Sequence, residues 1–109
     1  MENQPIELDE KTMLLTIFLR HQQTMNVNEI NEKLSKTGFW KNFPPEGIEV
    51  ASWYVMMGIG QVVTLKVPVK RLREVNLAIE RGAWGAYFTE FYTTYDFIPV
   101  WKNFRDQNK

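Results

Sequence analysis

His21 and Glu90 are the strongest candidates for acid–base chemistry in this sequence. His21 is the only imidazole, and it follows an apolar run over 12–20, where it would overlook the open end of a cavity between a sheet and its helices. An imidazole gains and loses a proton near neutral pH, as a general base must. The alternatives are a solvent-exposed loop histidine beside Gln22 and Gln23, or a histidine that contacts a ligand without proton transfer.

Glu90 interrupts the aromatic run over 86–95, where neighbouring rings would desolvate its carboxylate unless a cation pairs with it. An unpaired carboxylate in that setting would suit proton transfer. An ion pair with Arg20 or Lys66 would instead be structural. Both alternatives stay open on the sequence alone.

Aromatic side chains are the candidates for ligand contact. Trp53 and Tyr54 are neighbours in a β-rich run, so they must point to opposite faces of a strand and only one can line a given cavity. Core packing is the alternative for both. If a ligand site exists, Trp53, Tyr92 and Trp84 would stack on a flat organic molecule, with tyrosine hydroxyls supplying orientation. The predicted ligand-binding residues are Arg20, Trp53, Tyr54, Trp84 and Tyr92.

The elements that would position these residues follow from periodicity and turn signals. Apolar alternation and β-branched or aromatic enrichment predict strands, and the two helices are marked by cap residues and by apolar residues at helical spacing. The run IEVASWYVMMGIGQVVTLKV has a glycine pair at its centre, which is typical of a hairpin. In order, the expected elements are a strand over 12–20, a helix from Asn26 to Gly38, a hairpin over 48–67, a helix from Pro68 to Gly82 and a strand over 86–95.

Four segments need separate expectations. The double proline in 39–47 predicts a packed, non-helical connection. The basic cluster at 70–73 is either a solvent-facing surface or a small anion-binding spot. The tail over 96–109 is too apolar for exposure in water, so we expect it to pack across a subunit boundary. The polar stretch over 1–11 is expected to be a flexible lead-in.

The order strand, helix, strand, strand, helix, strand predicts one α+β domain over 12–109, a ferredoxin-like βαββαβ fold whose two helices cover one face of an antiparallel four-stranded sheet. The other face would carry a mixed set that includes Thr16, Arg20, Thr64, Lys66 and Glu90. Because both faces of the hairpin are largely apolar, this second face needs cover as well. We therefore expect a homodimer with two facing sheets, or a higher oligomer.

The segment SWYVMMGIGQVVTLKVP resembles the second and third strands of small dimeric α/β-barrel domains, particularly the GYD-domain group. Gly58 matches the glycine of that group's Gly-x-Tyr-Asp turn, and Gly60 and Gln61 stand at its Tyr and Asp positions. The resemblance implies a dimeric α/β barrel. Proteins of this fold include muconolactone-isomerase-like enzymes, cofactor-independent antibiotic-biosynthesis monooxygenases, haem-degrading enzymes and the amino-acid-sensing domain of leucine-responsive regulators, so the fold does not settle the function.

Composition argues against several classes of function. Thirteen basic and thirteen acidic residues cancel, which leaves no net positive field for nucleic acid or an anionic membrane. RNA recognition through an RRM-like sheet would need aromatics in a basic third strand, and QVVTLKV has none. Without cysteine and with one histidine, no structural metal is expected, and no cofactor. The acidic N-terminus and the lack of a long apolar run predict no membrane span and a cytoplasmic location.

Two functions remain. The first is a cofactor-free enzyme that isomerises or oxygenates a small cyclic or aromatic compound. The second is a binding or sensing module without turnover, which the lack of an acid–base pair at a recognisable spacing favours. Substitution of His21 and Glu90 should abolish turnover in the first case and leave binding largely intact in the second.

Overall fold

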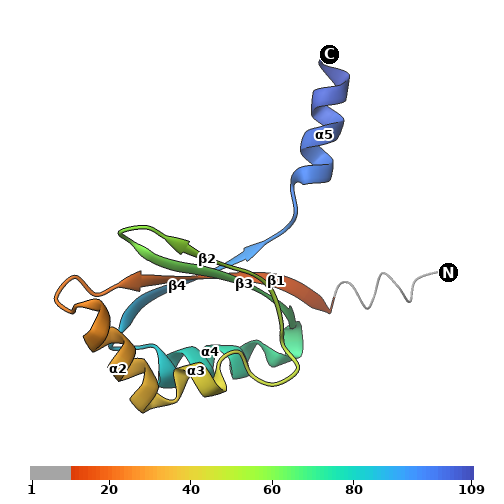
Figure 1. The fold of residues 1–109 in the computed structure, drawn as a ribbon. Coiled ribbons are helices and arrows are strands. Elements are labelled where there is room, and N and C mark those ends of the chain that lie inside the picture. Colours follow the sequence, from red (N-terminus) through yellow and green to blue (C-terminus); the bar gives the residue numbers. More distant parts are fainter. Residues whose placement is uncertain (1–10) are drawn as a thin grey trace.

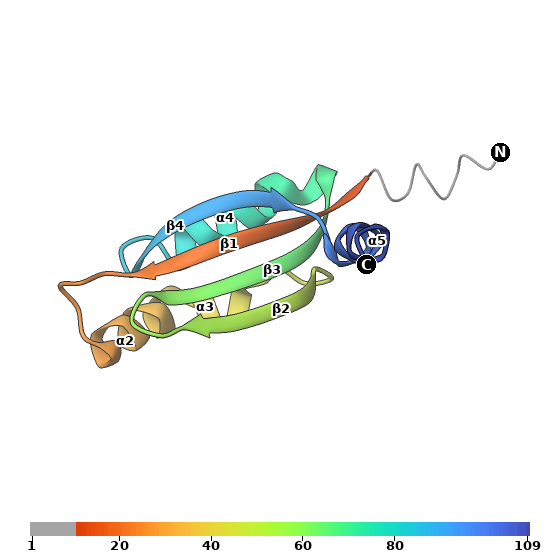
Figure 2. The same ribbon diagram turned by 90° about the horizontal axis from the view of Figure 1, so that it is seen from above.

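A computed structural model describes residues 11–109, which form an α+β structure around a four-stranded antiparallel sheet in the order β2-β3-β1-β4 (Figure 2). This order and the βαββαβ succession are compatible with the ferredoxin-like fold. The lead-in expected over 1–11 falls, except for Lys11, outside the described residues. The elements are β1 (Thr12–His21), α2 (Val27–Thr37), α3 (Phe39–Asn42), β2 (Glu49–Met56), β3 (Gly60–Pro68), the 3₁₀ turn η1 (Val69–Arg71), α4 (Leu72–Gly82), β4 (Tyr87–Thr94) and α5 (Ile98–Gln107).

The central strand β1 divides its side chains between two faces of the sheet, as its alternation predicts. Leu15, Ile17 and Leu19 are buried beneath the helices, and Ile17 lies opposite Val63 of β3 and Phe91 of β4. The helices α2, α3 and α4 all lie on this one side of the sheet (Figure 1). The predicted arrangement of two helices on one face is therefore confirmed, with α3 added to them.

Local signals explain the two longer helices of that layer. Asn26 and Glu29 form a reciprocal capping box at the start of α2, with both bonds at 2.8 Å, and Gly38 ends α2 in the left-handed conformation. Val75 and Ile79 bury the inner stripe of α4. These helices begin and end within a few residues of their predicted bounds.

Two helices were not predicted. The connection over 39–47 opens with the single turn α3, which precedes its prolines and stacks Phe39 on Phe43 with ring centroids 5.0 Å apart. The prediction that this whole connection is non-helical is thus wrong for its first four residues. The tail forms α5, because Pro99 lies in the first turn, where its missing N–H costs no helical hydrogen bond. In the described part of the chain, no helix has the length and apolar character that crossing a membrane requires.

The sheet face opposite the helices carries the predicted mixed set, and we call it the open face. Strand register assigns to it alternate residues of all four strands: Leu14, Thr16, Phe18 and Arg20 of β1, Glu49, Ser52, Tyr54 and Met56 of β2, Val62, Thr64 and Lys66 of β3, and Phe88, Glu90, Tyr92 and Thr94 of β4. At its centre, the Thr16 hydroxyl lies 2.9 Å from that of Thr64 and 3.0 Å from that of Thr94. Of its four large aromatic side chains, Tyr54, Phe88 and Tyr92 are 50–67% exposed.

Candidate functional site

A half-open cavity of about 210 Å³ lies where the β2–β3 turn and the end of β1 meet the start of α2. We call it the end cavity. Its walls combine apolar side chains with a few polar groups, and two glycines of the turn let the backbone form part of its surface. The lining residues are His21, Val27, Ile30, Asn31, Val55, Met56, Gly58, Gly60, Gln61 and Tyr87.

A short chain of hydrogen bonds fixes one polar wall of the end cavity. The indole N–H of Trp53 donates to Oε1 of Gln61 at 2.7 Å, and the amide nitrogen of Gln61 lies 3.4 Å from the hydroxyl of Tyr87. The tyrosine is buried, and desolvation raises the pKa of its phenol, so the neutral form is favoured. The phenol is therefore held as a neutral hydrogen-bonding group beside the cavity.

His21 is the last residue of β1, not the first residue after the strand. Its backbone N–H donates to the carbonyl of Ile59 at 2.8 Å, and its ring Nδ1 lies 3.3 Å from the carbonyl oxygen of Gln22. It is the register partner of Tyr87, and both residues line the end cavity. This is the cavity-facing position that the sequence predicts for the imidazole.

Glu90 lies on the open face, away from the end cavity. Nε of Arg20 donates to its Oε1 at 2.9 Å, which is the ion pair expected as the structural alternative. Because His21 and Glu90 project from opposite faces of the sheet, they cannot act together in one cavity. The structure does not bring the two predicted catalytic residues together.

The predicted aromatic ligand set is also divided between sites. Trp53 packs beneath the helices against Phe39 and Phe43, with centroids 6.4 and 5.7 Å away. Tyr92 lies on the open face, edge-on to Phe18 at 5.7 Å. The expectation that Trp53, Tyr92 and Trp84 stack on one molecule is wrong, because the pleat sends the first two to opposite faces.

The remaining predicted contacts lie outside the end cavity as well. Tyr54 and Arg20 belong to the open face. Trp84 precedes β4, where its indole N–H donates to the hydroxyl of Thr89 at 3.1 Å and its ring is largely exposed. None of these three side chains lines the end cavity.

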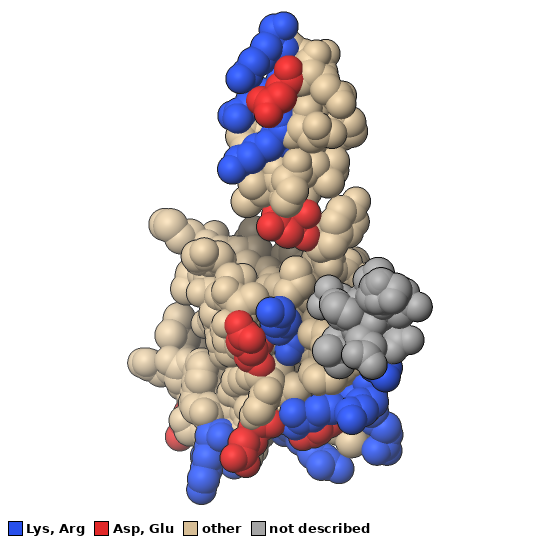
Figure 3. Space-filling model, turned by 90° about the vertical axis from the view of Figure 1, so that its right-hand side faces the viewer, with Lys and Arg blue, Asp and Glu red and all other residues tan. Residues whose placement is uncertain are grey.

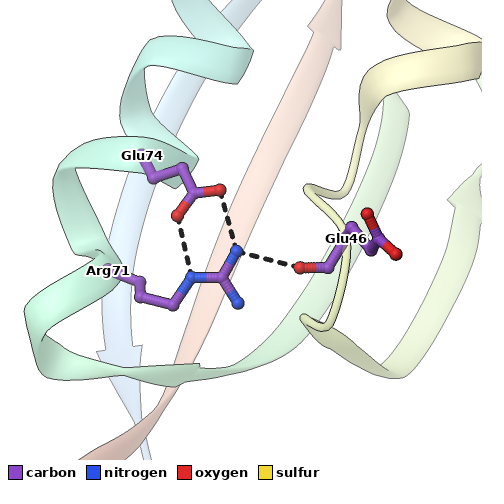
Figure 4. A network of polar contacts seen from close by, with 3 residues as sticks. All are labelled: Glu46, Arg71 and Glu74. Atoms are coloured by element: carbon purple, nitrogen blue, oxygen red, sulfur yellow. Dashed lines mark hydrogen bonds and ion pairs between the residues drawn. The ribbon is translucent and has the colours of Figure 1, made fainter.

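The basic cluster at 70–73 contains a structural clamp. Nε and Nη2 of Arg71 each donate to the carboxylate of Glu74 at 2.8 Å, and Nη2 also donates to the carbonyl of Glu46 at 2.9 Å (Figure 4). The hydrogen bond from Arg71 lowers the pKa of Glu74. Because this guanidinium ties α4 to the loop before β2, it supports the structural interpretation of the cluster over anion binding.

Gln61 and Tyr87 are the site residues that sequence reasoning missed. Gln61 shares its strand face with Val63, Leu65 and Val67, so it is the one polar residue in an apolar alternation. That interruption is a usable signal for a buried hydrogen-bonding role. Tyr87 gave no such signal, because it is one of several aromatic residues in its run.

Within residues 11–109, no group of three or more His, Asp or Glu side chains is placed to hold a metal ion. Fold and site together define an α+β protein with a small cavity at one end of its sheet. No protein-family model, curated protein or solved structure matches the chain.

Proposed function

We propose that this protein binds a small cyclic organic molecule in the end cavity, as a homodimer built like a dimeric α/β barrel. The observation that carries the proposal is the composition of the cavity wall. Apolar side chains from α2 and β2 face polar groups from β1, β3 and β4, which is the usual arrangement of a small-molecule site.

The size of the cavity favours a single ring. An engineered apolar cavity of about 150 Å³ in another protein holds benzene, so a volume of about 210 Å³ suits one ring with a small substituent. The amide of Gln61, the phenol of Tyr87 and the imidazole of His21 offer hydrogen bonds to such a substituent. No Asp or Glu lines this cavity, which favours a ligand without positive charge.

The open face supports the homodimer. Its exposed rings and its partly exposed Leu14, Phe18 and Val62 form a contiguous apolar surface, and such surfaces mark interaction sites. The charged residues of this face are Arg20 and Glu90, which pair with each other, and Glu49 and Lys66, which lie opposite each other in the register of β2 and β3. A second copy of the same face would cover this surface.

A cavity-filling variant tests the binding site. Val27 is exposed at the mouth of the end cavity, so Val27→Trp should obstruct it without disturbing the core. The matched control is Glu32→Trp on the exposed side of the same helix. Phenol titrated into the native protein should shift the NMR signal of the Trp53 indole N–H, and this shift should be lost in Val27→Trp and kept in Glu32→Trp. Equal shifts in all three proteins would contradict the proposed site.

Acid–base turnover in the same cavity is a second candidate, favoured by the register pairing of His21 with Tyr87 at its wall. In the isomerisation of a cyclic ketone, a histidine base removes the proton next to the carbonyl group while a neutral phenol donates a hydrogen bond to the carbonyl oxygen. The test is deuterium incorporation from D₂O into cyclohexenone, which should require His21 and be lost in His21→Gln. If the native protein incorporates no deuterium yet binds phenol, the binding function stands and this second candidate fails.

A further inference from the structure

The C-terminal helix α5 lacks the packing partner that its sequence demands. Three large aromatic residues at helical spacing share one side of it, each 47–53% exposed, and we call them the arm face: Phe97, Trp101 and Phe104. Among the described residues, α5 makes no substantial contact with any other element. Figure 3 shows the charged side chains of α5 gathered along one side and uncharged ones along the other.

We propose that α5 is an exchanged arm, whose arm face packs on a second copy of this chain. The proposal deepens the homodimer proposed above and rests on it. The position of α5 is the first argument, because it rises from the end of the sheet on the side of the open face, opposite α2 and α4 (Figure 1). A second sheet laid on the open face would therefore have α5 beside it.

The length of the arm fits this geometry. Stacked sheets pack about 10 Å apart, and a helix of ten residues is about 15 Å long. An arm that stands up from one sheet thus reaches past the plane of a sheet laid on it. The start of the arm is fixed by Asp96, whose Oδ1 accepts from the backbone N–H of Ile98 at 2.9 Å.

The area of the two surfaces gives the second argument. Four strands of eight to ten residues present a footprint of about 500 Å². A stable interface of standard size buries about 800 Å² on each partner. The three half-exposed aromatic side chains of the arm face add about 300 Å², because a fully covered aromatic side chain buries about 150–250 Å². The open face and the arm face together reach the standard size.

Charge also favours a second copy over a charged partner. The chain has thirteen basic and thirteen acidic residues, so two copies do not repel each other through net charge. The nearest charge to the arm face is Arg105, whose guanidinium lies over its own Trp101 at 4.7 Å. Both surfaces belong to one chain, so a two-fold axis pairs each arm with the other copy.

Photo-crosslinking with isotope-labelled chains tests the exchange. The chain has no cysteine, so Phe104→Cys gives one attachment point for a benzophenone maleimide. The modified chain is mixed with a large excess of isotopically heavy native chain, mixed dimers are verified by native mass spectrometry, and the sample is irradiated. We expect cross-linked peptides in which the arm is light and the captured segment, from the strands or strand ends of the partner, is heavy.

The matched control is Lys102→Cys, on the charged side of the same helix, which should lose most of these cross-links. Trp101→Cys, one turn earlier on the arm face, replaces Phe104→Cys if that variant does not fold. Mixed dimers with cross-links only within light chains, or with none, would overturn the exchange and leave the dimer standing. A monomer would overturn both.

Discussion

Gln61 should stabilise the native state through its bond to Trp53, and Gln61→Leu tests this. The substitution keeps much of the side-chain volume but leaves the indole N–H, 2.7 Å from its acceptor in the native protein, without a partner in a partly buried site. An unsatisfied buried donor costs about 1–3 kcal/mol. The longer contact to Tyr87, at 3.4 Å, adds little. We therefore expect a loss of about 1–2 kcal/mol in the free energy of unfolding.

The assay is urea unfolding at pH 7, followed by circular dichroism at one fixed protein concentration, because association would make stability concentration-dependent. Trp53→Phe supplies the second arm of a double-mutant cycle, since phenylalanine has no donor to leave unpaired. In that background, Gln61→Leu should cost about 1 kcal/mol less than in the native chain. Gln23→Leu, in the exposed loop after β1, is the matched control and should change stability by less than about 0.5 kcal/mol.

Two results would refute the reasoning. One is a Gln61→Leu protein as stable as the native protein. The other is an equal loss in both backgrounds, which would mean that the effect does not pass through Trp53.

Three further perturbations concern the phenol, the clamp and the β2–β3 turn. Burial raises the pKa of Tyr87, so the phenol keeps its proton to higher pH in the folded state than in the unfolded state. The free energy of unfolding should therefore fall as pH rises above the unfolded pKa near 10. In unfolding measured from pH 8 to 11, Tyr87→Phe should lose this part of the pH dependence. The hydrogen bond from Arg71 lowers the pKa of Glu74, so the ionised carboxylate stabilises the fold above the usual glutamate range, and this stabilisation is lost as pH falls through the folded pKa. Glu74→Gln should therefore be less stable than the native protein at pH 7 but lose less stability on acidification. Equal acid sensitivity of the two proteins would contradict the clamp. A Cβ at Gly60 would overlap a backbone carbonyl of β1, whereas one at Gly58 meets nothing within 4 Å. Gly58→Ala should cost about 1–2 kcal/mol of stability because of its positive φ. Thermal melts should show Gly60→Ala as far more destabilised than Gly58→Ala.

Local signals in the sequence were sufficient for most of the fold. The capping box at Asn26 and the glycine at 38 mark the ends of α2 because their capping hydrogen bonds are made with residues of the helix itself. Strand alternation likewise identified both sheet faces. The helix of the tail was not predicted, although Pro99 is compatible with it, because proline is well tolerated in the first turn of a helix.

The site was harder to predict because it depends on strand register. The sequence predicted that His21 faces a cavity, because the order of the elements puts the end of the first strand at the open end of the space between sheet and helices. It did not pair Gln61 with Trp53 or bring Tyr87 to His21, because those contacts join two different strand pairs, β2 with β3 and β1 with β4. It also named both His21 and Glu90 as catalytic candidates, although the register places them on opposite faces.

Native mass spectrometry of the untagged chain tests the account most directly, because subunit count and any bound small molecule appear in one spectrum. The account predicts a species of twice the 12.9 kDa chain mass, with phenol retained when it is added and lost in Val27→Trp. A single-chain species at all micromolar concentrations would contradict the facing-sheet dimer. Phenol retained equally by Val27→Trp would contradict the end cavity as its binding site.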